Sequence, residues 1–141
     1  MVMTVHVDIV SAEREIFSGQ AEMIFAPAVL GEVGIAPGHA PLLTRLGPGE
    51  VRLKLADNKE QAFYVSGGIL EVQPRIVTIL SDTAERAEDL DEAAALKSKE
   101  AAERQLAEGH AAMDYARALS ELAEAAAQLQ TIQRMRRRSG R

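Results

Sequence analysis

The sequence predicts an α+β protein, with an N-terminal antiparallel β-sandwich followed by a C-terminal two-helix antiparallel hairpin. All five prolines and eight of the ten glycines precede Asp82, and these residues mark turns. Short segments between them alternate apolar and polar residues, as strands with one buried face do. Beyond Asp82, alanine and charged residues dominate, and most of these favour helix. We place the boundary between the two domains at residues 86 and 87, giving domains 1–86 and 87–141.

Alternation predicts the strands of the first domain in order. Residues 5–9 and 51–55 alternate strictly, and the turn at Asp57-Asn58 leads from the second of these into the next strand. The expected strands cover residues 5–9, 23–25, 51–55, 61–65, 69–72 and 76–80. Many short strands separated by turn residues are typical of two packed sheets, since stacking hides both apolar faces.

The segment 31–43 is rich in glycine and proline, so we predict a long connecting loop there. Its glycines suit a backbone that adopts positive φ values or passes close to a neighbour. The simplest interpretation of such a segment is a connection between strands.

The second domain reads as two helices joined by a turn. Asp89 or Asp91 can cap the first helix, Gly109 interrupts the pattern, and Asp114 can cap the second helix. One stripe on the second helix carries Tyr115, Leu119, Leu122, Ala126 and Leu129. On the first helix, one arc carries Ala95, Ala102 and Leu106, with Leu96 at its margin.

Alanine dominates the expected seam between the helices. Burying a leucine stabilises a protein by roughly 1.5–3 kcal/mol, and alanine contributes far less. We therefore expect a weakly held hairpin that docks on something else or exists in more than one arrangement.

Charge is distributed unevenly along the chain. The formal net charge is −5, which argues against a general nucleic-acid binder. Five arginines lie within residues 134–141 without any acid. Without them, 11 basic residues face 21 acidic ones, a body of about −10 that carries a tail of +5. This tail is suited to an acidic partner.

No segment predicts a membrane span or a signal peptide. No apolar run approaches the ~20 residues needed to cross a bilayer, and His6 and Asp8 make the N-terminal segment too polar for a signal peptide. We expect membrane association only through a partner.

The residues that usually carry catalysis form no recognisable motif. Gly67-Gly68 lacks the lysine of a phosphate-binding loop, and the three histidines have no metal-ligand spacing. Ser11, Ser18 and Ser66 have no nucleophile-elbow context, and the chain has no cysteine. We predict no catalytic residue, no metal and no cofactor.

Several motifs, in order and spacing, resemble the epsilon subunit of the bacterial F-type ATP synthase. They lie in segments 11–19, 31–35, 37–43, 66–72 and 80–84, and the match continues through Asp114-Tyr115-Ala116 to the arginine-rich end. The resemblance therefore covers nearly the whole chain.

The resemblance implies a non-catalytic central-stalk subunit of a proton-translocating ATP synthase, peripheral on the cytoplasmic face of the bacterial inner membrane. A sandwich of about ten strands would bind the gamma shaft and the c-ring through the region of Glu32, Gly34 and His39. The helices would lie folded on the sandwich or extend among the alpha and beta subunits. In the extended form they would inhibit ATP hydrolysis, with a contact to beta through Arg134, Arg136, Arg137 and Arg138.

One departure concerns ATP. Some members of the family bind ATP through a Leu-Asp-x-x-Arg-Ala pattern, whereas this chain has Ala94 in place of the arginine. On the second helix, Ala123, Glu124 and Gln128 stand where further basic residues are expected. Without those cations a triphosphate lacks its charge-assisted hydrogen bonds, so we predict weak or absent ATP binding.

Two other classes of function are alternatives. One is a free-standing adaptor that binds an acidic protein or RNA through the arginine-rich tail, although net charge and the lack of aromatics beside the arginines oppose RNA. The other is a small β-sandwich enzyme, for which no catalytic constellation is found.

Overall fold

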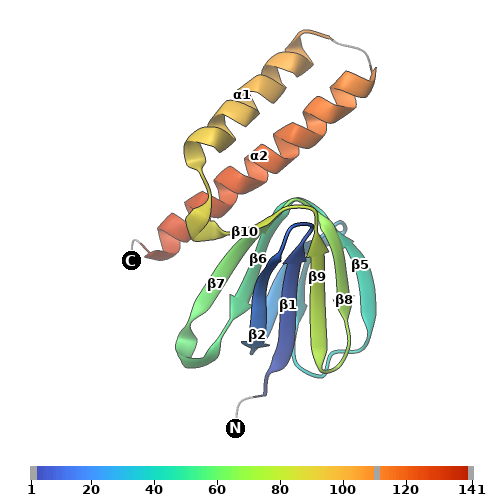
Figure 1. Ribbon diagram of the computed structural model, residues 1–141, viewed down its shortest axis with the longest axis vertical. Helices are drawn as coiled ribbons and strands as arrows, with labels where there is room; N and C mark the ends of the chain where they lie inside the picture. The colour runs from blue at the N-terminus through green and yellow to red at the C-terminus, as the bar shows by residue number, and fades with distance from the viewer. Residues whose placement is uncertain (1–2, 110–111, 140–141) are drawn as a thin grey trace.

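The computed structural model describes residues 3–109 and 112–139 and confirms the predicted β-sandwich followed by a helical hairpin (Figure 1). Ten strands form the first domain: β1 Val5–Ser11, β2 Glu15–Ala21, β3 Met23–Ala28, β4 Gly31–Ile35, β5 Leu42–Leu46, β6 Gly49–Lys54, β7 Glu60–Val65, β8 Gly68–Val72, β9 Ile76–Ser81 and β10 Ala84–Arg86. Short 3-10 turns occupy η1 Ala56–Asn58 and η2 Ala87–Asp89, and the helices are α1 Glu92–Ala107 and α2 Ala112–Ser139.

The strands form one continuous sheet that folds over on itself. Its order is β10-β7-β6-β3-β5-β8-β9-β1-β2, with β4 added to β3. Every pairing is antiparallel except that of β1 with β9, which runs parallel from His6↔Ile76 to Ser11↔Ser81. Alternation alone does not predict this exception, because the two strands lie some 70 residues apart.

Aliphatic side chains fill the space between the two layers. The inward positions follow the two-residue period of each strand, as Val5, Val7 and Ile9 show on β1. Phe63 is the largest fully buried side chain of this core, while the neighbouring Tyr64, also fully buried, faces the other way, toward α2. The core thus matches a composition poor in aromatics.

Two sequence-based expectations about local structure are wrong. The segment 31–43 is not one long loop: residues 31–35 form β4, paired with β3 from Ala28↔Gly31 to Ile24↔Ile35. Pairing with β3 across the tight turn at residues 29–30 overrides the loop-like composition there. Asp114 does not cap α2, because the helix already begins at Ala112 and Asp114 lies in its first turn. Strands β2, β5 and β10 were also not predicted.

The seam of the hairpin consists of small residues spaced by seven. Ala95 and Ala102 on α1 are buried, as are Ala118 and Ala125 on α2, followed by Ile132. The predicted stripe lies beside this seam: Tyr115 and Leu119 remain nearly half exposed, and Ala126 is exposed. Small residues let the two helices approach closely, so bulky neighbours are displaced to the flanks.

The hairpin meets the sandwich at one end (Figure 1). The main contacts join α2 to β6, β7 and η2. The start of α2 projects away from the sheets, so the docked part of α2 is its C-terminal half. Among the described residues, no helix is both long and apolar enough to cross a membrane.

Candidate functional site

A single buried carboxylate on the sandwich receives the arginine-rich end of α2. Glu50 lies on β6, and α2 covers its side chain to 2% exposure. Arg138 Nη2 donates to Glu50 Oε2 at 2.9 Å, and Arg138 Nη1 donates to Oε1 at 3.4 Å. Arg134 Nη1 lies 3.8 Å from the same carboxylate. Sequence reasoning missed Glu50, because a lone acid on the outward face of a strand normally lies in solvent.

Two further arginines at this end differ in their partners. Arg136 forms a bidentate ion pair with Glu92, in the first turn of α1. Arg137 is exposed and has no ion pair within residues 3–109 and 112–139. The structure therefore brings three of the four predicted inhibitory arginines onto acids of this same chain and leaves one free.

Arg52 extends the charge cluster across the sandwich. Its Nε lies 3.6 Å from Glu50, its Nη2 lies 3.3 Å from Glu32 on β4, and its guanidinium stacks 4.4 Å above the ring of Phe25. A buried carboxylate needs charged or hydrogen-bonding partners to offset its desolvation. Glu50 has three, of which α2 supplies two.

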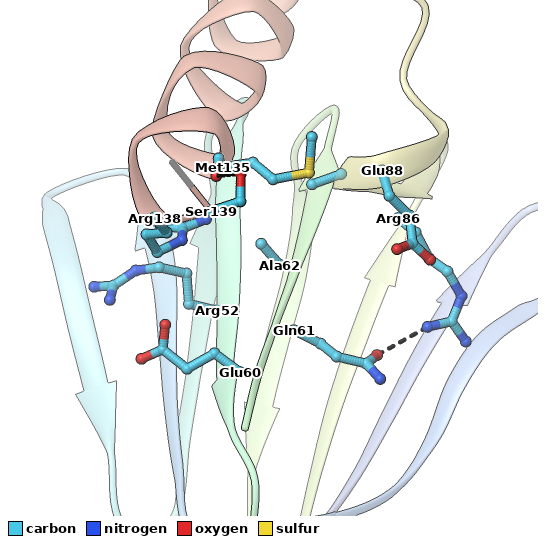
Figure 2. Close-up of a pocket in the computed structure, with 10 residues that line it drawn as sticks. Arg52, Glu60, Gln61, Ala62, Arg86, Glu88, Met135, Arg138 and Ser139 are labelled. Carbon is cyan, nitrogen blue, oxygen red and sulfur yellow. Dashed lines mark hydrogen bonds between the residues drawn. The ribbon is translucent and has the colours of Figure 1, made fainter. Parts of the chain in front are cut away.

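An open cleft of about 460 Å³ remains beneath the end of α2 (Figure 2). Met135, Arg138 and Ser139 line it from the helix, while Glu60 and Gln61 line it from β7. On its other side Arg86 is fixed, because it donates to Gln61 Oε1 at 2.8 Å and to the Ile16 carbonyl at 3.2 Å. The end of α2 is therefore held to the sandwich by ion pairs beside a space that side chains do not fill.

Further along α2, the groups facing the sandwich are acidic. The Tyr64 hydroxyl is buried, with Gln128 beside it but no hydrogen bond of normal geometry among the described residues. Burial, and then the charge of Glu124, raise the pKa of Tyr64. The pKa of Glu124 is itself raised, mainly by burial and then by Glu121 and Asp82.

At the altered ATP-binding pattern, where Ala94 replaces the arginine, the residues cap and begin α1. Asp91 is the N-cap of α1 and accepts a hydrogen bond from the Ala94 amide at 3.1 Å. The Ala94 side chain is exposed and carries no charge. On α2, Ala123 is exposed and Glu124 is an acid, so these three positions offer a triphosphate no cation.

The residues predicted to face gamma and the c-ring lie on β4 and in the loop that follows it. Glu32 and Gly34 are exposed on β4, two positions apart and so on one face. His39 is half-buried in the loop that follows, where its Nδ1 donates to the Ala40 carbonyl at 2.6 Å. Next to β4, the turn residue Leu30 is 99% exposed.

The register of β1 with β2 brings His6, Asp8 and Ser18 together, a grouping that sequence spacing did not predict. Asp8 Oδ1 and Ser18 Oγ both reach the same ring nitrogen, His6 Nε2, at 2.9 and 3.2 Å. A nucleophile relay needs the carboxylate on the opposite ring nitrogen. Ser18 instead donates to Asp8 at 2.7 Å and is the main cause of the lowered pKa of Asp8. The cluster is a polar ladder on the sheet surface.

No group of acids and histidines in the described residues could hold a metal ion. What the structure offers is a ten-stranded sandwich, a helical hairpin whose seam is lined with alanines, and a charged contact between them. These features define a small two-part protein whose parts are joined by ion pairs between α2 and β6.

Comparison with known proteins identifies the family. Residues 4–87 match the family model "ATP synthase, Delta/Epsilon chain, beta-sandwich domain", and residues 88–133 match "ATP synthase, Delta/Epsilon chain, long alpha-helix domain". The chain belongs to the ATP synthase delta/epsilon family. The predicted resemblance is confirmed, and with it the prediction of a non-catalytic subunit.

Relatives and solved structures agree with this assignment. The chain is 64% identical to the ATP synthase epsilon chain of Nitrosococcus oceani, covering 99% of this chain and all of the relative. It is 60% identical to the epsilon chain of Alkalilimnicola ehrlichii, covering 98% of this chain and 99% of that one. A chain of the Euglena gracilis mitochondrial ATP synthase has the same fold, with a TM-score of 0.78 at 19% identity over 87% of this chain and 78% of that one.

Proposed function

We propose that this chain is a central-stalk subunit that couples rotation of gamma and the c-ring to ATP synthesis, and that its hairpin inhibits ATP hydrolysis. The observation that carries the proposal is the contrast between a well-packed sandwich and an alanine-seamed arm. In this assignment residues 1–86 form the coupling domain and residues 87–141 the regulatory one. The subunit lies peripherally on the cytoplasmic face of the bacterial inner membrane.

Exposed apolar side chains support a partner surface on strands β5, β8 and β9. Ile69 and Leu80 lie directly opposite each other in the β8–β9 register and are 45% and 48% exposed. Leu43 on β5 is 70% exposed and lies diagonally across from Ile69. Contiguous exposed apolar residues mark interaction sites, and this face is suited to the gamma shaft.

A second contact, with gamma and the c-ring, is supported by β4 and the segments at its two ends, which carry Val29, Leu30, Glu32, Gly34 and His39. Leu30 is almost fully exposed, and an aliphatic side chain in that position gains free energy from burial against a partner. Glu32 adds an exposed acid beside it.

The arginines of α2 support the inhibitory role. Release from the sandwich frees Arg134 and Arg138, which join Arg137 in a cationic end that fits an acidic surface on a beta subunit. Arg136 joins them when α2 also separates from Glu92 of α1. Each exposed pair contributes only ~0.2–1 kcal/mol, so several must act together to hold the extended arm.

Truncation tests whether the sandwich carries the coupling role and the hairpin the inhibitory one. A chain ending at Arg86 should still assemble with gamma and support ATP synthesis, while the complex loses inhibition of hydrolysis. The control is the full-length chain assembled in the same way. Hydrolysis that stays as restrained with the truncated chain would contradict the role given to the hairpin.

A further inference from the structure

We infer that Glu50 is a latch that holds the hairpin down, by competing for the arginines that the released arm would use on its partner. The inference rests on the function proposed above and names the residue that regulates it. Arg138 uses both of its Nη atoms on the Glu50 carboxylate, so the docked helix cannot present them to an acid of another subunit. The two states of the arm are therefore mutually exclusive at this residue.

The latch has the position that such a device requires. Glu50 is fixed in β6 by pairing with Tyr64 of β7, while Arg138 lies 88 residues further on, at the far end of α2. Between them the chain passes through the short η2 turn, Ala87–Asp89, and the residues before α1. Breaking the contact at the end of a long helix lets the whole hairpin swing away from the sandwich.

The energetics suit a reversible contact. Pairing a buried carboxylate with arginine contributes little net free energy, because desolvation offsets most of the attraction. Removing one partner is costly, because the other charge then stays near the interface without compensation. A latch of this kind keeps the docked and released states close in free energy, yet makes the balance depend strongly on a single side chain.

The charged groups around Glu50 indicate what kind of partner can replace it as the acid that binds α2. The cations that face it are Arg52, Arg134 and Arg138. Arg52 belongs to the sandwich and stays when the arm leaves, so Glu50 retains one counter-ion after release. The partner that replaces Glu50 for α2 must therefore supply carboxylates of its own.

The first test uses the full-length subunit alone and the variant Glu50→Gln, which keeps the size of the side chain and removes its charge. Hydrogen exchange of amides in residues 126–139 should accelerate by at least about tenfold, while exchange in the sandwich strands stays unchanged. The matched control is Glu71→Gln, which removes the same charge from an exposed position on β8. Unchanged exchange in residues 126–139 would overturn the latch.

The second test separates the latch from the proposed function. In the assembled complex, Glu50→Gln should strengthen inhibition of ATP hydrolysis, because more of the arm is released. Faster exchange in the lone subunit without any change in hydrolysis would support the latch and contradict the inhibitory role of the hairpin. Weaker inhibition would overturn the competition that the latch implies.

Discussion

The Arg138 guanidinium lies 2.9 Å from the Glu50 carboxylate, across the boundary between hairpin and sandwich. This contact joins the two parts of the molecule that sequence reasoning had treated separately. Because Arg138 makes this contact and its neighbour Arg137 does not, substitutions at the two residues should have different effects.

Arg138→Gln and Arg137→Gln should differ in their effect on docking. Arg138→Gln removes a latch contact, so α2 should exchange faster in the lone subunit. Arg137 has no ion pair in the described chain, so Arg137→Gln should leave exchange unchanged. In the assembled complex Arg137→Gln should weaken inhibition by up to about fivefold, the effect of one exposed ion pair. Equal effects of the two variants on docking would contradict the assignment.

Overpacking the alanine seam should destabilise the hairpin. Ala125 is 2% exposed, so Ala125→Leu inserts three carbons where the helices touch. Overpacking of this kind costs about 1–3 kcal/mol. Both helices should lose protection from hydrogen exchange while the sandwich keeps its thermal midpoint. Ala116→Leu, at an exposed position of the same helix, is the control and should change neither.

Substitution of Gly68 should lower the stability of the sandwich. It adopts φ +125°, and an added Cβ would lie 1.9 Å from the Leu80 carbonyl oxygen. Gly68→Ala should therefore cost more than about 2 kcal/mol in the free energy of unfolding, measured by urea titration. Gly38 also has a positive φ, but an added Cβ there meets nothing within 4 Å. Gly38→Ala should cost only about 1–2 kcal/mol, and a larger cost than that of Gly68→Ala would refute this reasoning.

Docking should depend on pH through Glu124. Its pKa in the docked state is raised above the ordinary value of 4.5, mainly by burial. A raised carboxyl pKa means that docking favours the protonated form of Glu124, so the contribution of Glu124 to docking is fully present below about pH 4.5 and is lost as pH rises through the raised pKa. Glu124→Gln should flatten this dependence and strengthen docking at neutral pH.

The chain has no cysteine of its own, so dyes on cysteines introduced at the exposed positions Lys59 and Ala116 can report docking by energy transfer. The same pH slope in the variant and in the parent would show that Glu124 is not the responsible group.

The isolated subunit should bind ATP weakly or not at all. Ala94 supplies no cation, and the acidic groups around Glu124 repel a triphosphate. Calorimetry should detect no micromolar binding. The variant Ala94→Arg with Glu124→Arg should increase the affinity, because both changes provide guanidinium groups. Micromolar affinity in the unmodified chain would overturn the prediction.

Much of the fold could be predicted from the sequence because its signals are local. Strict alternation located β1 and β6, and the turn at Asp57-Asn58 is present, with positive φ at both residues. On α1 the alanines of the seam were also visible, since Ala95 and Ala102 lie two helical turns apart, whereas the stripe predicted on α2 missed Ala118 and Ala125. These features depend on neighbours a few positions away.

What was missed has two causes. β4 looked like a loop because its glycines hide the strand pattern, although it pairs with β3 across the tight turn at residues 29–30, after which Gly31 adopts φ +131°. The docking site instead depends on contacts between distant segments. Glu50 looked like a surface acid, because the helix that buries it follows more than 60 residues later. No local pattern contains that information, so the docking site required the structure.

The most direct test of the account is to tether the arm in its docked position. Ala62 on β7 and Met135 on α2 line the same cleft (Figure 2), so cysteines at both sites can be joined by a short bis-maleimide in the assembled complex. If the hairpin inhibits only after leaving the sandwich, ATP hydrolysis should rise to the level of the complex with the chain ending at Arg86. Inhibition that persists with the arm tethered would contradict the account.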